Sequence, residues 1–294
     1  MAFRPRLETA LIYLICSRFR MGGIFLRIWR IPTVRKLINF PRHFHFMLTS
    51  FRETNLEDRE EIDRVANSLR RDGFAITHIG RLSGMPGIQE LQEEYDLLLE
   101  RERQKPHSRK SKVYIERLVD DDYDFRNNGE SPFSKFVRNS SLNTIASIYL
   151  RLTPKKTSFK VWRSHFTGEA NRTASQNWHR DYNEFQMIRC FLYLNNVTLQ
   201  GGAGEYIVGS HYLGDSYNLL EYSEESGTYA TDKEISDNFD ASRVIAAEGG
   251  EGTVVLIDTA GLHRGGYHSV PSERRVALLT FSTAADIMPT RIPI

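Results

Sequence analysis

The sequence has few cysteines, no long hydrophobic run and no internal repeat, and each absence excludes a class of protein. Its only cysteines, Cys16 and Cys190, lie among apolar residues, which argues against a disulfide framework and for a reducing compartment. The apolar run at residues 11–16 is far shorter than the roughly 20 residues that cross a bilayer, and no small-residue cleavage site follows it. We therefore expect no cleaved signal peptide, no transmembrane helix and a cytoplasmic protein.

The net charge of +2 hides an uneven distribution along the 294 residues. Residues 1–50 contain nine arginines and lysines against one acid, Glu8, so the remainder is mildly acidic. Apolar positions at helical spacing predict a basic amphipathic helix over 7–31. Such a helix can lie on an anionic membrane, here the inner face of one, or pack on the protein body; a disordered leader is the third interpretation. We expect no nucleic-acid partner, and the sequence does not indicate an oligomeric state.

The pattern changes from helical to strand-like part-way along the chain. Helices are predicted at about 55–71, 86–103 and 132–149, with strands at 74–77 and 112–118 between them. Short strands bounded by Gly, Asn and Asp turns then follow at 157–166, 176–181, 187–195, 204–208, 243–247, 252–257 and 274–282. This order predicts a mainly β fold with flanking helices: a double-stranded β-helix, or cupin-type jelly roll, backed by N-terminal helices.

The predicted organisation is a basic N-terminal segment, 1–50, followed by a single domain, 51–294. Residues 212–240 interrupt the strand pattern and are interpreted as an insertion that forms a lid or a substrate loop.

The candidate site begins with His179 and Asp181, which are two residues apart in a predicted strand. At that spacing both side chains lie on one face of the strand. His263 directly follows a later predicted strand, so a returning chain can bring it to the same place. Two imidazoles and one carboxylate on one face of a metal are typical of non-haem Fe(II) oxygenases. The competing interpretations are a structural His–carboxylate hydrogen bond, and His268 in place of His263.

Further motifs follow in a fixed order, and together they carry a family resemblance. They are His179-x-Asp181, Arg189-Cys190-Phe191-Leu192-Tyr193-Leu194-Asn195-Asn196-Val197, Gly201-Gly202-Ala203-Gly204, Gly209-Ser210-His211, Asp258-Thr259-x-Gly261-x-His263-Arg264-Gly265 and Glu273-Arg274. In this order they resemble the phytanoyl-CoA dioxygenase family. The resemblance implies a double-stranded β-helix, Fe(II) held by His179, Asp181 and His263, and 2-oxoglutarate and O2 as cosubstrates.

An arginine at the start of the last strand completes the expected site. The distal carboxylate of 2-oxoglutarate needs a fixed cation, and a planar guanidinium can bind it through two hydrogen bonds. Arg274 and Arg275 both qualify and, as strand neighbours, face opposite ways, so only one points into the barrel. The resemblance favours Arg274 without settling the choice. Lys112, Tyr114, Lys160 and Trp162 are further candidates for the pocket wall, while Trp178 is expected to face away from the metal.

The resemblance implies a hydroxylase that releases succinate and CO2. Asp181 supports hydroxylation, because related halogenases carry a small residue there. The alternatives are a non-catalytic cupin-like protein that binds a metal or ligand, and a different metal enzyme on the same barrel. The expected substrate is a small molecule, a lipid or a glycolipid, with the Kdo sugar of lipopolysaccharide as one candidate.

Overall fold

The computed structural model describes residues 57–104, 110–112, 114–120, 129–181, 186–220 and 229–283, together with residue 40 and residues 43–47. The basic helix expected over 7–31, and the membrane contact assigned to it, lie outside these residues. Within the described residues, no helix has both the length and the apolar content needed to cross a bilayer. The division into a 1–50 segment and a 51–294 domain stays a prediction.

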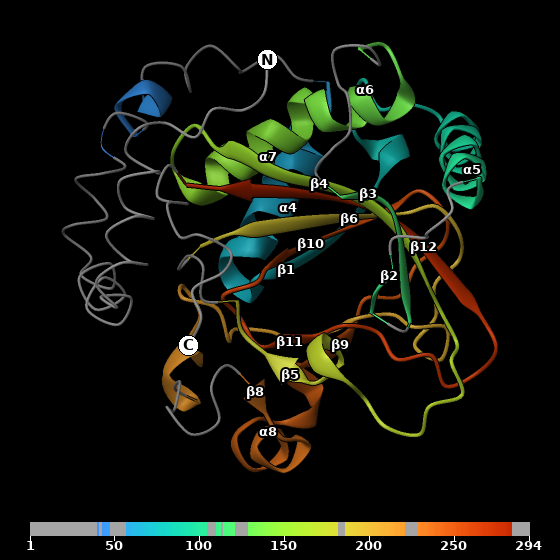
Figure 1. Ribbon diagram of the computed structural model, residues 1–294. Coiled ribbons are helices and arrows are strands. Elements are labelled where there is room, and N and C mark those ends of the chain that lie inside the picture. Colours follow the sequence, from blue (N-terminus) through green and yellow to red (C-terminus); the bar gives the residue numbers. More distant parts are fainter. Residues whose placement is uncertain are drawn as a thin grey trace, which may run out of the picture.

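Two antiparallel sheets form the body of the protein and face each other (Figure 1). The larger sheet has the strand order β1 (Phe74–His78), β10 (Thr253–Asp258), β6 (Ile188–Tyr193), β12 (Glu273–Ser282), β4 (Lys155–His165), β3 (Ile115–Asp120) and β2 (Lys110–Lys112). The smaller sheet has the order β8 (Tyr229–Ala230), β5 (Trp178–His179), β11 (His263–Arg264), β7 (Glu205–Ile207) and β9 (Val244–Ala246). This arrangement confirms the predicted jelly roll.

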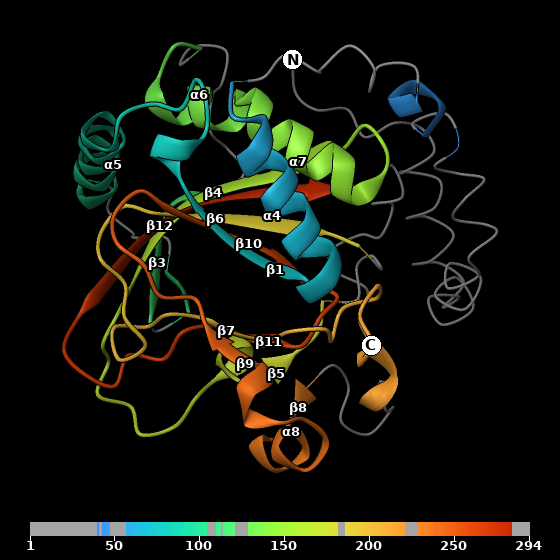
Figure 2. The same ribbon diagram turned by 180° about the vertical axis from the view of Figure 1, so that it is seen from behind.

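Helices cover the outer face of the larger sheet (Figure 2). They are α4 (Arg59–Asp72), α5 (Ile88–Arg103), α6 (Pro132–Arg138) and α7 (Ser140–Leu150). α4 shows why the sequence folds this way, since acidic residues occupy its first turn and Arg70 and Arg71 its last, as the helix dipole favours. It ends at Gly73, whose φ of 71° lies in the left-handed region that glycine adopts at little cost. Gly73 thereby turns the chain directly into β1.

Strand β10 shows that the larger sheet is the middle layer of the protein. Val254 and Leu256 pack into the core beneath the helices, whereas Val255 and Ile257 pack between the two sheets. Side chains alternate between the faces of a strand, so a strand buried on both faces must be covered on both. The inner face of this sheet is therefore available to form a cavity above the smaller sheet.

Two predicted elements were wrong in detail. The helix predicted at 132–149 is divided between α6 and α7 at Asn139, whose side chain accepts the backbone N–H of Leu142 as a helix cap and donates to the Ser83 carbonyl. The single strand predicted at 112–118 is instead the antiparallel pair β2 and β3. Within 212–240 the structure also contains β8 and α8 (Asp232–Asn238), the latter capped by Thr231.

Candidate metal centre and cosubstrate pocket

The two predicted histidines meet on the smaller sheet. His179 on β5 and His263 on β11 stand directly opposite each other in an antiparallel pair, with ring centroids 4.3 Å apart. Asp181 lies just beyond β5, held by a hydrogen bond of 2.8 Å from its backbone N–H to the Thr259 carbonyl. One ligand atom from each of His179, Asp181 and His263 lies within 4.8 Å of the others, so the fold brings the predicted set together.

Hydrogen bonds fix which nitrogen of each histidine faces the centre of this cluster. Nδ1 of His179 lies 2.9 Å from the Asn177 carbonyl oxygen, and Nδ1 of His263 lies 3.0 Å from that of Gly261. A carbonyl only accepts, so both rings carry the proton on Nδ1 and keep a lone pair on Nε2. Burial, and next the electrostatic effect of a second titratable ring, His179, close by, lower the pKa of His263 to about 3, so its ring is neutral at physiological pH.

The spacing within the cluster suits an ion better than direct hydrogen bonds. Nε2 of His179 lies 4.0 Å from Asp181 Oδ1, and Nε2 of His263 lies 3.9 Å from Oδ2. Both gaps exceed hydrogen-bond length. Burial raises the pKa of Asp181, but Arg189, with Nη2 at 2.8 Å from Oδ2, and the two histidines outweigh it and leave that pKa lowered. The carboxylate is therefore ionised and the donor set is the one that divalent iron takes.

The cluster opens into a cavity of about 360 Å³ between the two sheets. Arg274 lines this cavity, is 8% exposed and donates from Nη1 to the Gly202 carbonyl at 2.6 Å. Its Nε is buried without a hydrogen-bond partner, and no carboxylate pairs with it within the described part of the chain. Burial lowers its pKa, while Tyr193 and Tyr114 favour its charge. A buried cation with an unused donor is suited to a ligand carboxylate.

Arg275 faces away from this cavity. Its Nε donates to Glu273 at 2.6 Å, its Nη1 lies 3.5 Å from Asp96, and its guanidinium lies over the ring of Tyr95 on α5. Those partners are on the outer face of the larger sheet. Of the two arginines that the sequence left open, the structure thus places Arg274 alone beside the cluster.

The remaining candidates divide between the cavity and the core. Tyr114, Lys160 and Trp162 line the cavity, whereas the side chain of Lys112 lies outside the described part. His268 hydrogen-bonds to Ser164 at 3.0 Å and to Ser272 at 2.9 Å, away from the metal cluster. Trp178 is 3% exposed and packs beneath the smaller sheet, turned from the cluster as predicted.

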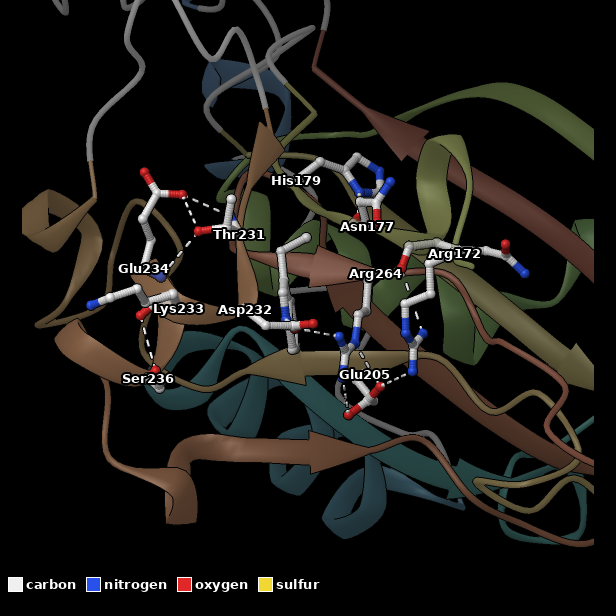
Figure 3. Close-up of polar contacts among 12 residues, drawn as sticks. Arg172, Asn177, His179, Glu205, Thr231, Asp232, Lys233, Glu234, Ser236 and Arg264 are labelled. Carbon is white, nitrogen blue, oxygen red and sulfur yellow. Dashed lines mark hydrogen bonds and ion pairs between the residues drawn. The ribbon is translucent and has the colours of Figure 1, made fainter. Parts of the chain in front are cut away.

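Sequence analysis missed two arginines that support the histidine strands. Arg264 follows His263, and its guanidinium lies 4.3 Å from the ring centre of Trp178. The same guanidinium forms ion pairs with Glu205 and Asp232, so β7 and α8 are linked to the strand that carries His263 (Figure 3). Arg264 belongs to the motif quoted around His263, but nothing in the sequence indicated its contacts with Trp178, Glu205 and Asp232.

The second missed residue is Arg180, between His179 and Asp181. Its side chain is buried and donates to the carbonyls of Ala260 at 2.8 Å and Tyr217 at 3.0 Å, and also to that of Ser210. Ala260 precedes His263 in a tight turn, and Tyr217 lies in the segment predicted as an insertion. Arg180 therefore joins three parts of the chain: the end of β5, the turn before His263 and the segment that contains Tyr217.

A model of the phytanoyl-CoA dioxygenase (PhyH) family matches residues 69–276, which include every residue of the metal cluster and Arg274. The chain belongs to the phytanoyl-CoA dioxygenase family. No curated protein matches the chain. The match confirms the family that the motifs predicted and the predicted class of enzyme, a non-haem iron dioxygenase.

Solved structures with this fold are similar in architecture and distant in sequence. The epimerase SnoN, crystallised with Fe3+, α-ketoglutarate and nogalamycin RO, has a TM-score of 0.54 and 13% identity over 77% of this chain and 85% of its own. EctD from S. alaskensis, crystallised with 2-oxoglutarate and 5-hydroxyectoine, has a TM-score of 0.52 and 16% identity over 76% of both chains. The carbocyclase SnoK has a TM-score of 0.51 and 15% identity over 75% of this chain and 84% of its own. They show the shared fold of this phytanoyl-CoA dioxygenase family member. In the present protein, the donor set of His179, Asp181 and His263 fits the predicted iron. The expected cosubstrate, 2-oxoglutarate (α-ketoglutarate), is present in the structures of SnoN and EctD.

Proposed function

We propose that the protein is a hydroxylase that uses Fe(II), 2-oxoglutarate and O2 to place a hydroxyl group on an unactivated C–H bond of its substrate. The observation that carries the proposal is the buried cluster of His179, Asp181 and His263 opening into the same cavity as Arg274. The cluster offers the donor set of an iron oxygenase. The arginine offers the carboxylate partner that a dicarboxylate cosubstrate needs.

Each residue has a distinct part in this proposal. The Nε2 atoms of His179 and His263 and the carboxylate of Asp181 would hold the iron from one side, leaving its other positions for ligands. Arg274 would hold the distal carboxylate of 2-oxoglutarate, and its burial excludes water that would compete for the guanidinium. With both groups bound, the centre supplies the oxidation in which O2, 2-oxoglutarate and the substrate C–H bond give an alcohol, succinate and CO2.

Asp181 favours hydroxylation over halogenation. A halogenating centre of this type needs a position vacated by the carboxylate, and here the carboxylate is present, ionised and turned into the cluster. The same residue argues against a purely structural pair, since Asp181 stands 3.9 Å or more from both imidazoles rather than at hydrogen-bond length.

The substrate we propose is either a free small molecule or a lipid or glycolipid in a membrane. The Kdo sugar of lipopolysaccharide is one candidate of the membrane-borne kind. Support for the membrane-borne form is the basic composition of residues 1–50 in the sequence. Sedimentation with phosphatidylglycerol vesicles, compared with phosphatidylcholine vesicles, tests it. Equal sedimentation with both would contradict peripheral attachment through residues 7–31.

In the decisive experiment for the reaction, the protein is loaded with Fe(II) and 2-oxoglutarate without O2 and mixed with metabolite and lipid extracts. O2 is then added. We expect succinate and a product heavier than its precursor by one oxygen atom, both absent with His179→Ala. Metal binding without 2-oxoglutarate binding would instead favour a non-catalytic cupin-like protein. Turnover of another kind that survives substitution of Arg274 and Arg275 would favour a different metal enzyme.

A further inference from the structure

A tryptophan in the wall of the cavity has a polar group to which the proposed function gives no role. Trp162 on β4 is 8% exposed and lines the same cavity as Arg274. Its indole Nε1 is buried and has no hydrogen-bond partner within the described part of the chain. An indole N–H can only donate, and a buried donor without an acceptor is costly. Such a group calls for an explanation, and a bound ligand is one.

The unused donor of Trp162 has one counterpart in the cavity wall. Among the cavity-lining side chains that the structure describes, the buried donors without a partner are Nε1 of Trp162 and Nε of Arg274. Tyr193, on the same wall, is different, because its hydroxyl donates to the Ala247 carbonyl at 2.7 Å. The two idle N–H groups therefore mark one part of the cavity as incomplete without an acceptor.

Strand register makes Trp162 and Arg274 neighbours. Arg274 on β12 stands opposite Ser164 on β4, and Trp162 stands opposite Val276. Trp162 and Arg274 are thus diagonal neighbours, and both face the cavity. Diagonal positions of an antiparallel pair are about 7–8 Å apart, within reach of aromatic and long side chains. A single ligand group can therefore contact both donors.

The indole also lies between Arg274 and the metal cluster. Its ring packs edge-on against Phe191 on β6, with the ring centroids 6.3 Å apart. Phe191 stands opposite the residue four positions beyond Arg274 on β12, and Arg189, two residues from Phe191, contacts Asp181. Phe191 fixes the indole by packing but offers no oxygen or nitrogen as an acceptor. A dicarboxylate that extends from the metal cluster to Arg274 therefore passes the indole N–H.

We propose that Trp162 is a second binding residue for 2-oxoglutarate, whose distal carboxylate accepts a hydrogen bond from Nε1 while it pairs with Arg274. An ionised carboxylate has two oxygens and about four acceptor sites, more than the guanidinium alone fills. A donor on the metal side of the cation fixes the direction in which the rest of the molecule extends. This inference rests on the proposed function, to which it adds a residue that selects the cosubstrate.

The indole N–H signals in the NMR spectrum of the full chain, labelled with 15N at its three tryptophans, report this hydrogen bond directly. The protein is loaded with diamagnetic Zn(II) and titrated with 2-oxoglutarate or with 2-oxovalerate, which has a methyl group in place of the distal carboxylate. We expect the Trp162 signal to move downfield with 2-oxoglutarate and to stay in place with 2-oxovalerate. Trp29→Phe and Trp178→Phe assign the signal by elimination, so the measurement does not require a folded Trp162 variant.

Trp162→Phe removes the N–H and keeps an apolar ring in the wall. Loss of a hydrogen bond to a charged group should lower the affinity for 2-oxoglutarate by about tenfold to a hundredfold in calorimetry. The affinity for 2-oxovalerate should change by less than about twofold. Trp178→Phe is the matched control, because its Nε1 donates to Asp232 at 2.9 Å, away from this cavity, and it should leave both affinities within about twofold.

Three results would overturn the role of Trp162 and leave the proposed function standing. They are equal weakening of both ligands by Trp162→Phe, which shows a packing role alone, an equal loss of 2-oxoglutarate affinity in Trp178→Phe, and a Trp162 signal that does not move at saturating 2-oxoglutarate. In each of these the wild-type protein still binds 2-oxoglutarate, and Arg274→Gln still loses it. Absence of 2-oxoglutarate binding in every form, the wild type included, would refute the proposed function and this inference together.

Discussion

Replacing Arg274 by glutamine should remove cosubstrate binding without weakening the folded protein. The guanidinium is buried in the cavity, bonded to the Gly202 carbonyl, and carries an Nε with no partner. Truncating one member of a buried, hydrogen-bonded charge pair costs about 2–5 kcal/mol of binding. The affinity for 2-oxoglutarate should therefore fall by about 30-fold to several thousand-fold.

The effect on stability should be small because two contributions oppose each other. Glutamine loses a hydrogen bond worth about 1 kcal/mol, but it also removes a buried cation whose desolvation is costly. Arg275→Gln is the control, since that guanidinium pairs on the outer face and its loss should cost at most about 1 kcal/mol of stability.

Calorimetry with Mn(II) and thermal unfolding of both variants measure these quantities. Arg274→Lys adds a further comparison, because it keeps the charge and loses the planar fork, and should recover only part of the affinity. Unchanged 2-oxoglutarate affinity in Arg274→Gln, or its loss in Arg275→Gln, would refute the assignment.

Three further predictions concern the scaffold. Hydrogen bonding from Arg64, against the opposing effect of burial, lowers the pKa of Glu61 to about 2. The ionised carboxylate therefore stabilises the folded protein by about 1–2 kcal/mol after screening; this stabilisation is present above pH 4.5 and is lost as the pH falls towards 2. Thermal unfolding of Glu61→Gln should accordingly match that of the wild type only at the acidic end of the pH range. Arg180→Met leaves buried carbonyls unpaired and should lower the free energy of unfolding in urea by about 2–5 kcal/mol. Arg59→Gln, on the surface of α4, should lower it by only about 0.5 kcal/mol. Equal losses would contradict the role of Arg180 in linking these segments. Gly202→Ala would place Cβ 2.5 Å from His268 Nε2, whereas a Cβ at Gly84 would have its nearest atom 3.9 Å away. Both glycines have positive φ, so thermal melting should show Gly202→Ala to be less stable than Gly84→Ala by at least about 2 kcal/mol. Equal melting of the two variants would refute the clash.

Patterns in the sequence predicted the long elements and the pair of sheets, but not the shortest strands. β10 and β12 are apolar runs with clear boundaries, and their positions followed from composition. β8 and β11 have two residues each, too few for any periodicity to register. They exist because β5 provides a partner on each side. The break at Asn139 was equally hidden, since its cap depends on a contact with Ser83 far away in the sequence.

The site was predictable where chemistry restricts the residue type. Two histidines and an aspartate suggested a shared ion, and the structure brings them together, although their role as iron ligands stays a proposal. The choice between Arg274 and Arg275 required the strand register, which decides the inward face.

The most direct test of the account is anomalous scattering at the iron edge from crystals grown with Fe(II) without O2. We expect one iron peak at about 2.0–2.2 Å from Nε2 of His179, Nε2 of His263 and a carboxylate oxygen of Asp181. A peak bound elsewhere, or no peak between these side chains at saturating iron, would contradict the metal centre and every step that depends on it.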